Sequence, residues 1–356
     1  MPSPAPTRDT LAGKLPVSLI TGFLGSGKTT LLKHLLRDPG MNRAAVIINE
    51  FGEVGIDHEL VASSSESMTL LSNGCLCCTV RTDLQETLRE LFIKRRAGEV
   101  IDFDRVFIET TGLADPVPVL HTLQTDGMLG AQYRLDCVVT LVDAVNGPLN
   151  LDNAPEAAKQ AAVADRIVIT KSDIASPEAV AALEARLEQM NPYAARTVAI
   201  NGEVDVAFLR DVGPRSVRAT TRDLDRWLAP SGEARPAEGA YLGERVRAGT
   251  HDTSIRSFCL WFDKPFTWDT FSAAVQVLTS LRGPDLLRVK GLVNVAGESG
   301  PVVVQGAQHV FHPPVTLEAW SGEDRRSRIV FITRNLSRES VEALFAAVGT
   351  LAATGA

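Results

Sequence analysis

The chain has 356 residues, of which 45% are hydrophobic and 22% charged, and its formal net charge is −7. This length exceeds that of most single domains, so we expect two domains. The acidic balance argues against nucleic acid or an anionic membrane as the main partner. No apolar run approaches the roughly 20 residues that are needed to span a bilayer.

The first residues contain no apolar segment of the kind that a signal peptide has, so we expect a disordered tail over residues 1–13. Five cysteines in a chain without a leader suggest a cytoplasmic protein in a reducing environment. Clustered thiols in that environment point to metal or redox chemistry more than to structural disulfides.

Apolar runs typical of strands alternate with helical patterns between residues 14 and 215. This alternation predicts an α/β domain with a mostly parallel sheet flanked by helices, in which ligands bind at the carboxyl ends of the strands. The strands are expected at residues 17–21, 44–49, 68–71, 105–110, 135–142, 166–170 and 197–200, and helices at 79–96 and 176–190.

Residues 216–254 are rich in Pro, Gly and charged side chains without a sustained period, which indicates a linker. A smaller α+β domain with βαββαβ-like packing is expected over residues 255–352. Its strands are predicted at 257–262, 286–295, 301–305 and 328–333, and its helices at 267–281 and 337–348.

A phosphate-binding loop is predicted where the first strand ends, because residues 22–29 form the motif G-x-x-x-x-G-K-T and a helical run follows. Glycines let successive backbone N–H groups surround a phosphate, and the helix adds its positive dipole end. Lys28 is expected to reach the β- and γ-phosphates, and Thr29 to bind Mg²⁺. The residues expected to bind the triphosphate are Gly22, Phe23, Leu24, Gly25, Ser26, Gly27, Lys28, Thr29 and Thr30.

A second nucleotide signal is the acid and glycine that follow the strand at 105–110. Glu109 is expected to help hold Mg²⁺ through water, and the Gly112 N–H to contact the γ-phosphate. Lys28, Thr29 and Glu109 are therefore the predicted catalytic residues. The alternative is a core strand that runs into an ordinary turn.

A third signal is the segment Thr170-Lys-Ser-Asp173, which follows an apolar strand. Asp173 can accept both N–H donors on one edge of guanine, which adenine lacks, so the segment favours GTP. The stem of Lys171 can cover the base. Thr170 stands where an Asn is usual, and we expect this exchange to remove a tie between this segment and the phosphate loop.

Three cysteines, Cys75, Cys77 and Cys78, lie within four positions between a predicted strand and the helix at 79–96. Thiols near a helix N-terminus have a lowered pKa, which favours the metal-binding thiolate. Three ligands leave one of the four zinc positions open, which suits a site that hands its ion over. Buried small residues or a redox pair are the alternatives.

An acidic loop at residues 49–57 lies between these motifs, and Glu50 and Asp57 are candidate ligands of Mg²⁺ or the second metal. A solvated acidic loop is the alternative. His309 and His312 form H-x-x-H, which we interpret first as a surface feature and second as an auxiliary metal site. Cys137 and Cys259 lie in apolar strands and are expected to be core residues.

Together, the segments at 22–30, 49–57, 74–78, 109–116 and 170–173 resemble the CobW family of P-loop GTPases, and residues 290–293, 304–309 and 324–330 resemble that family's C-terminal domain. The resemblance implies a GTPase with Mg²⁺ as cofactor that delivers Zn²⁺ or Co²⁺ to a client metalloprotein, with Cys75, Cys77 and Cys78 as ligands. The chain departs from many members because residues 212–254 contain only one histidine, His251.

The leading hypothesis is that the GTP state controls metal affinity and that hydrolysis lets a client take the ion. A nucleotide-dependent homodimer could raise the turnover. The alternatives are a GTP-dependent activator or scaffold with a structural metal, and a small-molecule P-loop kinase.

Overall fold

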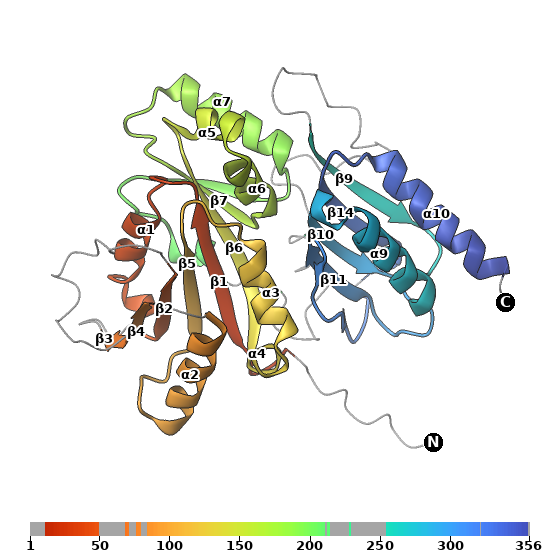
Figure 1. The fold of residues 1–356 in the computed structure, drawn as a ribbon, viewed down its shortest axis with the longest axis horizontal. Helices are drawn as coiled ribbons and strands as arrows, with labels where there is room; N and C mark the ends of the chain where they lie inside the picture. The colour runs from red at the N-terminus through yellow and green to blue at the C-terminus, as the bar shows by residue number, and fades with distance from the viewer. Residues whose placement is uncertain are drawn as a thin grey trace.

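The computed structural model describes residues 11–49, 68–70, 76–79, 84–210, 212–213, 228, 254–320 and 322–354. For residues 49, 68–70, 76–79, 124 and 351–354 it describes the backbone alone. Two sheets organise this part of the chain, and we call the residues around them the N-terminal unit (11–213) and the C-terminal unit (254–354) (Figure 1).

The N-terminal unit is built on an eight-stranded sheet with the order β3-β4-β2-β5-β1-β6-β7-β8. All its neighbouring strands are parallel except β3 and β4. This confirms the predicted mostly parallel sheet. The strands are β1 (Leu15–Gly22), β2 (Ala44–Asn49), β3 (Met68–Leu70), β4 (Leu76–Thr79), β5 (Arg105–Thr110), β6 (Tyr133–Asp143), β7 (Arg166–Thr170) and β8 (Ala195–Ala199).

Helices flank both faces of this sheet, as Figure 1 shows. Ser176 caps the helix after β7, because its Oγ accepts a hydrogen bond from the Ala179 N–H at 3.2 Å. The α-helices are α1 (Lys28–Leu35), α2 (Leu84–Ala97), α3 (Val117–Thr125), α4 (Gly127–Gln132), α5 (Gly147–Asn153), α6 (Pro155–Val163) and α7 (Pro177–Met190), with short 3₁₀ helices at Pro39–Met41 and Val206–Leu209.

Nearly every residue of the central strands β1, β5 and β6 is buried because both faces of the sheet are covered, as is typical of a parallel sheet. One core cluster contains Leu31 and Leu35 of α1 under Ile20 and Val46. Another lies beneath α2, α3 and α6 on the other face. Strand β1 lies at the centre of this core, and the phosphate loop follows its carboxyl end.

The C-terminal unit is an antiparallel sheet with the order β12-β11-β10-β14-β9, and β13 pairs with β11. Every strand and helix predicted here is present, and the structure adds two short strands, β12 and β13. The elements are β9 (Ile255–Phe262), α9 (Trp268–Arg282), a 3₁₀ helix (Gly283–Asp285), β10 (Leu286–Val293), β11 (Val302–Ala307), β12 (Val310–Phe311), β13 (Val315–Thr316), β14 (Ser327–Arg334) and α10 (Arg338–Thr354).

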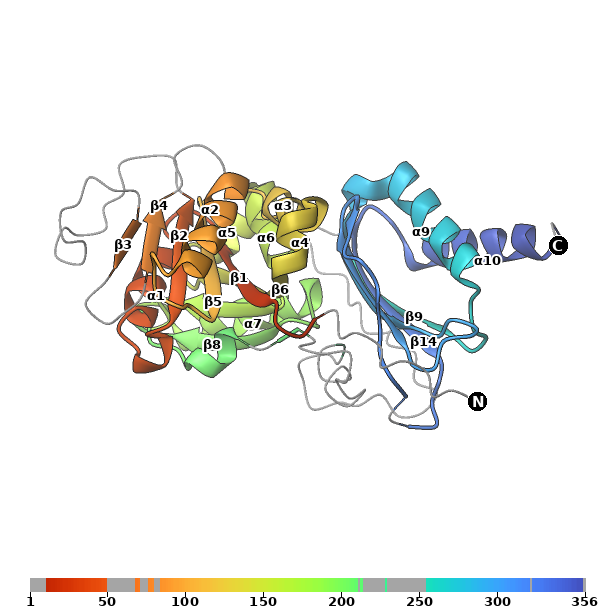
Figure 2. The ribbon, with the colours of Figure 1, turned by 90° about the horizontal axis from the view of Figure 1, so that it is seen from below.

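The second sheet is buried on both faces. Helices α9 and α10 cover one face, where Phe258, Phe331 and Phe345 pack together. The other face lies against the N-terminal unit, close to α3 and α6 (Figure 2). Leu287 and Ile332 of this face belong to the same core cluster as residues of those two helices. The two units therefore share a hydrophobic interface.

A group of three charged side chains is buried at the same interface. Asp165, between α6 and β7, lies against Arg288 and Lys290 of β10, and each of the three is at most 3% exposed. Asp165 also accepts a hydrogen bond from the Val138 N–H at 2.8 Å. Burial raises the pKa of Asp165, but the charges of Arg288 and Lys290 outweigh burial and hold that pKa well below its ordinary value.

Candidate nucleotide site

The phosphate loop (residues 22–29) adopts the conformation that its glycines allow. Gly25 and Gly27 have φ angles of 73° and 91°, which L side chains rarely adopt. A Cβ on Gly22 would lie 2.6 Å from the Leu141 carbonyl oxygen, so only glycine fits between β1 and β6 there. Helix α1 begins at Lys28, and its N-terminal N–H groups point towards the loop.

Lys28 is only 8% exposed, and its Nζ donates to the carbonyl oxygens of Gly22 at 2.9 Å and Phe23 at 3.3 Å. The ammonium group therefore lies over the loop, where two carbonyl oxygens accept hydrogen bonds from it. A phosphate anion competes well for such a cation, because a charge-assisted hydrogen bond is about twice as strong as a neutral one.

Thr29 and Glu109 meet beside the loop, since Thr29 Oγ1 donates to Glu109 Oε1 at 3.3 Å. Glu109 is the penultimate residue of β5, next to β1, and it is 2% exposed. A hydroxyl next to a carboxylate is the kind of oxygen donor set that Mg²⁺ prefers, so these two residues fit the expected metal.

Gly112 lies directly against the phosphate loop. A Cβ on Gly112 would be 2.8 Å from both the nitrogen and the Cα of Leu24, so a larger residue would push the two segments apart. The carbonyl oxygens of Gly112 and Ala114 accept hydrogen bonds from Gln160 Nε2 at 3.2 and 3.0 Å. We call residues 111–116, between β5 and α3, the Gly112 loop.

The prediction that Thr170 removes a tie to the phosphate loop is wrong. Thr170 Oγ1 donates to the Ser26 carbonyl oxygen at 2.8 Å, and its methyl group lies 3.6 Å from the position of a Cβ on Gly27. The hydroxyl of a threonine at the end of β7 thus reaches the loop on its own.

Lys171 is held by a residue that the sequence did not single out. Its Nζ lies 2.7 Å from Asp143 Oδ2, at the end of the neighbouring strand β6. Burial raises the pKa of Asp143, but hydrogen bonds from Lys171, Asn146 and backbone N–H groups outweigh this and lower it. Asp173 is exposed, so its carboxylate is accessible to a base.

Strand β4 corrects the predicted position of the cysteines. The backbone of Cys77 and Cys78 pairs with Val46 and Ile47 of β2, and the described part of α2 spans Leu84–Ala97. Cys77 and Cys78 therefore lie in the sheet and not between a strand and a helix, and the helix predicted to begin at Thr79 does not begin there. A short apolar and cysteine-rich run was too brief to be recognised as a strand.

Three predicted ligands, Cys75, Glu50 and Asp57, lie outside the described residues, as does the side chain of each cysteine in β4. Among the side chains that the structure describes, no group of three or more His, Cys, Asp or Glu could hold a metal. Cys137 and Cys259 are buried free thiols, which confirms them as core residues.

The two histidines of the H-x-x-H motif have different surroundings. His309 Nδ1 lies 3.1 Å from the Thr279 carbonyl oxygen, and its ring packs against Gly283. Burial, and then the positive charge of Arg288, lower the pKa of His312 to about 3. His312 is thus a half-buried neutral side chain near the interface and not a surface residue.

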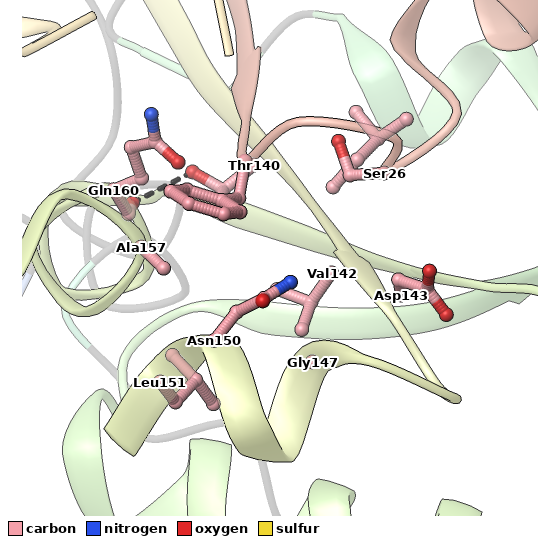
Figure 3. A pocket seen from close by; sticks show the side chains of 11 residues that line it. Ser26, Thr140, Val142, Asp143, Gly147, Asn150, Leu151, Ala157 and Gln160 are labelled. Carbon is pink, nitrogen blue, oxygen red and sulfur yellow. Dashed lines mark hydrogen bonds between the residues drawn. The ribbon is translucent and has the colours of Figure 1, made fainter. Parts of the chain in front are cut away.

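Sequence reasoning also missed Gln160, which is 1% exposed. It lies in α6, whose sequence is PEAAKQAAV, and it is a polar residue among buried alanines. An amide on a face that is otherwise apolar was the available signal. Gln160 lines a small pocket together with Ser26, Thr140 and Asp143 (Figure 3).

Three features meet at the carboxyl end of the parallel sheet: a glycine-rich turn, a buried lysine over it and a hydroxyl–carboxylate pair. Together they define a P-loop nucleotide-binding protein. Residues 16–197 match the nucleotide-binding domain of CobW/HypB/UreG, and residues 255–349 match the cobalamin synthesis protein cobW C-terminal domain. The chain belongs to the CobW family.

The similarity to known proteins extends over nearly the whole chain. The chain is 32% identical to the zinc chaperone YjiA of Escherichia coli, with 93% of this chain and 98% of YjiA aligned. It is 31% identical to the zinc chaperone CobW of Pseudomonas aeruginosa, over 92% and 90% of the two chains.

The crystal structure of the Zn(II)-bound YjiA GTPase from E. coli superimposes with a TM-score of 0.72 at 31% identity, covering 94% of this chain and 99% of that one. A Zn(II)-bound YjiA triple mutant, in which one glutamate and two cysteines are replaced by alanine, superimposes equally well. In the described part of this chain, no helix has the length and apolar character needed to cross a membrane.

Proposed function

We propose that this chain is a zinc-binding GTPase that passes Zn²⁺ to a client metalloprotein under the control of its nucleotide state, in the cytoplasm. The observation that carries the proposal is the end-to-end similarity to a zinc chaperone, 98% of which is aligned, combined with the geometry of the phosphate loop. Both units of the relative have counterparts in this chain, so the similarity is not limited to a nucleotide-binding fold.

The nucleotide chemistry follows from residues at the carboxyl end of the first sheet. The ammonium of Lys28 and the N–H groups of the phosphate loop and of α1 bind and orient the phosphates, and they stabilise the charge that develops during transfer. Thr29 and Glu109 would hold Mg²⁺, which neutralises charge on the phosphate oxygens. Gly112 would contribute its N–H to the γ-phosphate.

Selection of guanine depends on Asp173 in this proposal. The exposed carboxylate follows β7, whose end is fixed to the phosphate loop by Thr170. Asp173→Ala should therefore lose the preference for GTP over ATP, because no other acceptor for the two guanine donors is supplied by this segment. Competition between GTP and ATP for a fluorescent GDP analogue measures the preference.

The zinc ligands in this proposal are Cys75, Cys77 and Cys78. Support comes from the donor type, because thiolates are preferred ligands of zinc, and from the position of β4 in the same sheet as the phosphate loop, separated from β1 by β2 and β5. Ordering of the segments near the γ-phosphate would change the geometry at the strands beside them.

The test is a competition titration of Zn²⁺ with reduced protein, carried out with Mg²⁺ and either GDP or a slowly hydrolysed GTP analogue. The expected result is a different zinc affinity in the two states. Zinc affinity is the quantity to measure here, and not occupancy. A YjiA triple mutant that lacks two cysteines still carries zinc in its structure, so occupancy alone does not identify the ligands.

The double substitution Cys77→Ala with Cys78→Ala should abolish the difference between the two nucleotide states. A matched control is Cys137→Ala with Cys259→Ala, since both of these thiols are buried and burial raises the pKa of each. Equal zinc affinity with GDP and with the GTP analogue would contradict nucleotide-gated transfer and favour a scaffold with a structural metal.

A further inference from the structure

Gln160 is a buried amide that connects helix α6 to the Gly112 loop. Its Nε2 donates to the carbonyl oxygens of Gly112 at 3.2 Å and Ala114 at 3.0 Å, and its own backbone oxygen accepts from Thr140 Oγ1 at 2.7 Å. The dashed line in Figure 3 marks the bond to Thr140, on strand β6. One residue thus joins the sheet, the helix and the loop.

The orientation of the amide follows from its neighbours. Both partners are carbonyl oxygens, which only accept hydrogen bonds, so the NH₂ group and not the oxygen must face them. One NH₂ group carries two donors, and each of the two carbonyls takes one. An exchange of the amide for a group without donors would leave two carbonyl oxygens facing it without these bonds.

Helix α6 is itself held rigidly. Asn191 Nδ2 donates to the carbonyl oxygens of Ala161, Ala162 and Ala164 at the carboxyl end of the helix, at 3.1, 3.0 and 2.9 Å. The next residue along, Asp165, is fixed by the charged pairs at the interface. Gln160 therefore projects from a fixed element towards a loop.

The Gly112 loop has no room to shift towards the phosphate loop, since Gly112 already contacts Leu24. Two attachments hold it from the other side, the Gln160 amide and an ion pair between Lys159 and Asp115. Both come from adjacent residues of α6. The position of the Gly112 loop relative to the phosphate loop is thus set by α6.

We propose that Gln160 is a positioning residue for GTP hydrolysis, which holds the Gly112 loop where its N–H meets the terminal phosphate. The proposal rests on the assigned role of Gly112 in γ-phosphate binding, and it does not depend on zinc transfer. GDP has no γ-phosphate for this loop to contact, so Gln160 should affect hydrolysis of GTP and leave GDP affinity unchanged.

The test compares two substitutions that each remove a buried side-chain hydrogen bond. Gln160→Met acts at the Gly112 loop, and the control Thr333→Val acts in the C-terminal unit, where Thr333 Oγ1 donates to the Leu336 carbonyl oxygen at 2.7 Å. In Gln160→Met we expect kcat for GTP to fall about 10- to 100-fold, because small displacements of a positioning group have effects of this size, with GDP affinity within about twofold of wild type. In Thr333→Val the thermal midpoint should fall while kcat changes little at temperatures where the protein is folded.

A pH profile of Gln160→Glu gives a readout that a purely structural role would not change. The ionised carboxylate has only acceptors and repels the two carbonyl oxygens, whereas the protonated acid regains one donor. Burial raises the pKa of such a glutamate. The kcat of this variant relative to wild type should therefore rise as the pH is lowered.

Three results would overturn the proposal: an unchanged kcat in folded Gln160→Met, a loss of GDP affinity parallel to the loss of kcat, or a pH profile of Gln160→Glu parallel to wild type. If wild-type protein bound GDP but did not hydrolyse GTP, the proposed function would fail instead. The two failures are thus distinguishable from one set of measurements.

Discussion

Two regions of the molecule bury charged side chains, and they do so in opposite ways. At the nucleotide end, Lys28 is held by neutral carbonyl oxygens of its own loop. At the interface between the units, Asp165 is held by two full positive charges, Arg288 and Lys290. Hydrogen bonds from Lys28 to neutral carbonyl oxygens can be exchanged for stronger bonds to an anionic ligand, whereas Asp165 is paired with two buried positive charges.

The comparison distinguishes a buried charge that serves ligand binding from buried charges that stabilise the interface between the units. Phosphate can replace the two carbonyl acceptors of Lys28 with stronger, charge-assisted hydrogen bonds, so this cation is suited to ligand binding. Removal of one partner of Asp165 leaves uncompensated charge in an apolar interface, which is expensive. We expect substitutions in the first region to reduce activity and those in the second to reduce stability.

The largest effect is expected from Asp165→Ala. The substitution leaves Arg288 and Lys290 buried without their counter-charge, and it should lower the free energy of unfolding by about 3–5 kcal/mol. Urea denaturation followed by circular dichroism measures the change. If Arg288→Met and Lys290→Met are added, most of the loss should be recovered, because the interface then buries no charge; no recovery would contradict the electrostatic explanation.

Lys28→Ala should lower kcat for GTP about 10²- to 10³-fold, the typical effect of removing one group that stabilises the transition state. The free energy of unfolding should change by less than in Asp165→Ala, since the hydrogen bonds lost to the Gly22 and Phe23 carbonyl oxygens are worth about 1 kcal/mol each. The rate of phosphate release gives kcat, and urea denaturation of the same preparation gives the free energy of unfolding. A stability loss as large as that of Asp165→Ala would remove the distinction between the two regions.

Thr170→Val should have a smaller effect. It should cost about 1 kcal/mol, divided between the free energy of folding and that of GDP binding, because this is the usual contribution of one hydrogen bond. The bond from Thr170 Oγ1 to the Ser26 carbonyl is lost while the side-chain shape is kept. The affinity for GDP should fall by about fivefold if the whole effect appears in binding. Isothermal titration measures it, and Thr170→Ser is the control that retains the hydroxyl.

The smallest effect concerns acid stability and Asp126, which caps α4. Hydrogen bonds from the Leu129 N–H and then from Gln85 lower its pKa to about 2, from an ordinary value of 3.8. The stabilisation is therefore complete above about pH 4 and is lost as the pH falls towards 2. Thermal midpoints between pH 2 and 6 should fall less steeply in Asp126→Asn than in wild type; parallel curves would contradict this assignment.

Much of the fold follows from local sequence patterns. The strands at 44–49, 105–110 and 166–170 have the predicted bounds because each is an apolar run that is buried on both faces and bounded by polar residues. The prediction failed at β4, where four residues are too few for a period and the cysteines suggested a loop. The strand conformation of this segment depends on its pairing with β2, which is distant in the sequence.

The nucleotide site was predictable where one short motif supplies the whole arrangement, as in the phosphate loop. Gln160 and Asp143 were missed because their roles depend on which helix and strand lie beside the site, and spacing does not encode that. Thr170 was misinterpreted because the reach of its hydroxyl to the Ser26 carbonyl depends on how closely β7 approaches the loop.

The central claim, that the nucleotide state gates zinc, is tested most directly by timing the two releases in one experiment. Reduced protein loaded with Zn²⁺, Mg²⁺ and GTP is mixed with a zinc-binding dye, and zinc transfer and phosphate release are followed together over a single turnover. The account predicts that zinc transfer follows phosphate release and is slowed to the same extent in Lys28→Ala. Zinc transfer at one rate with GTP, GDP and a slowly hydrolysed analogue would contradict it.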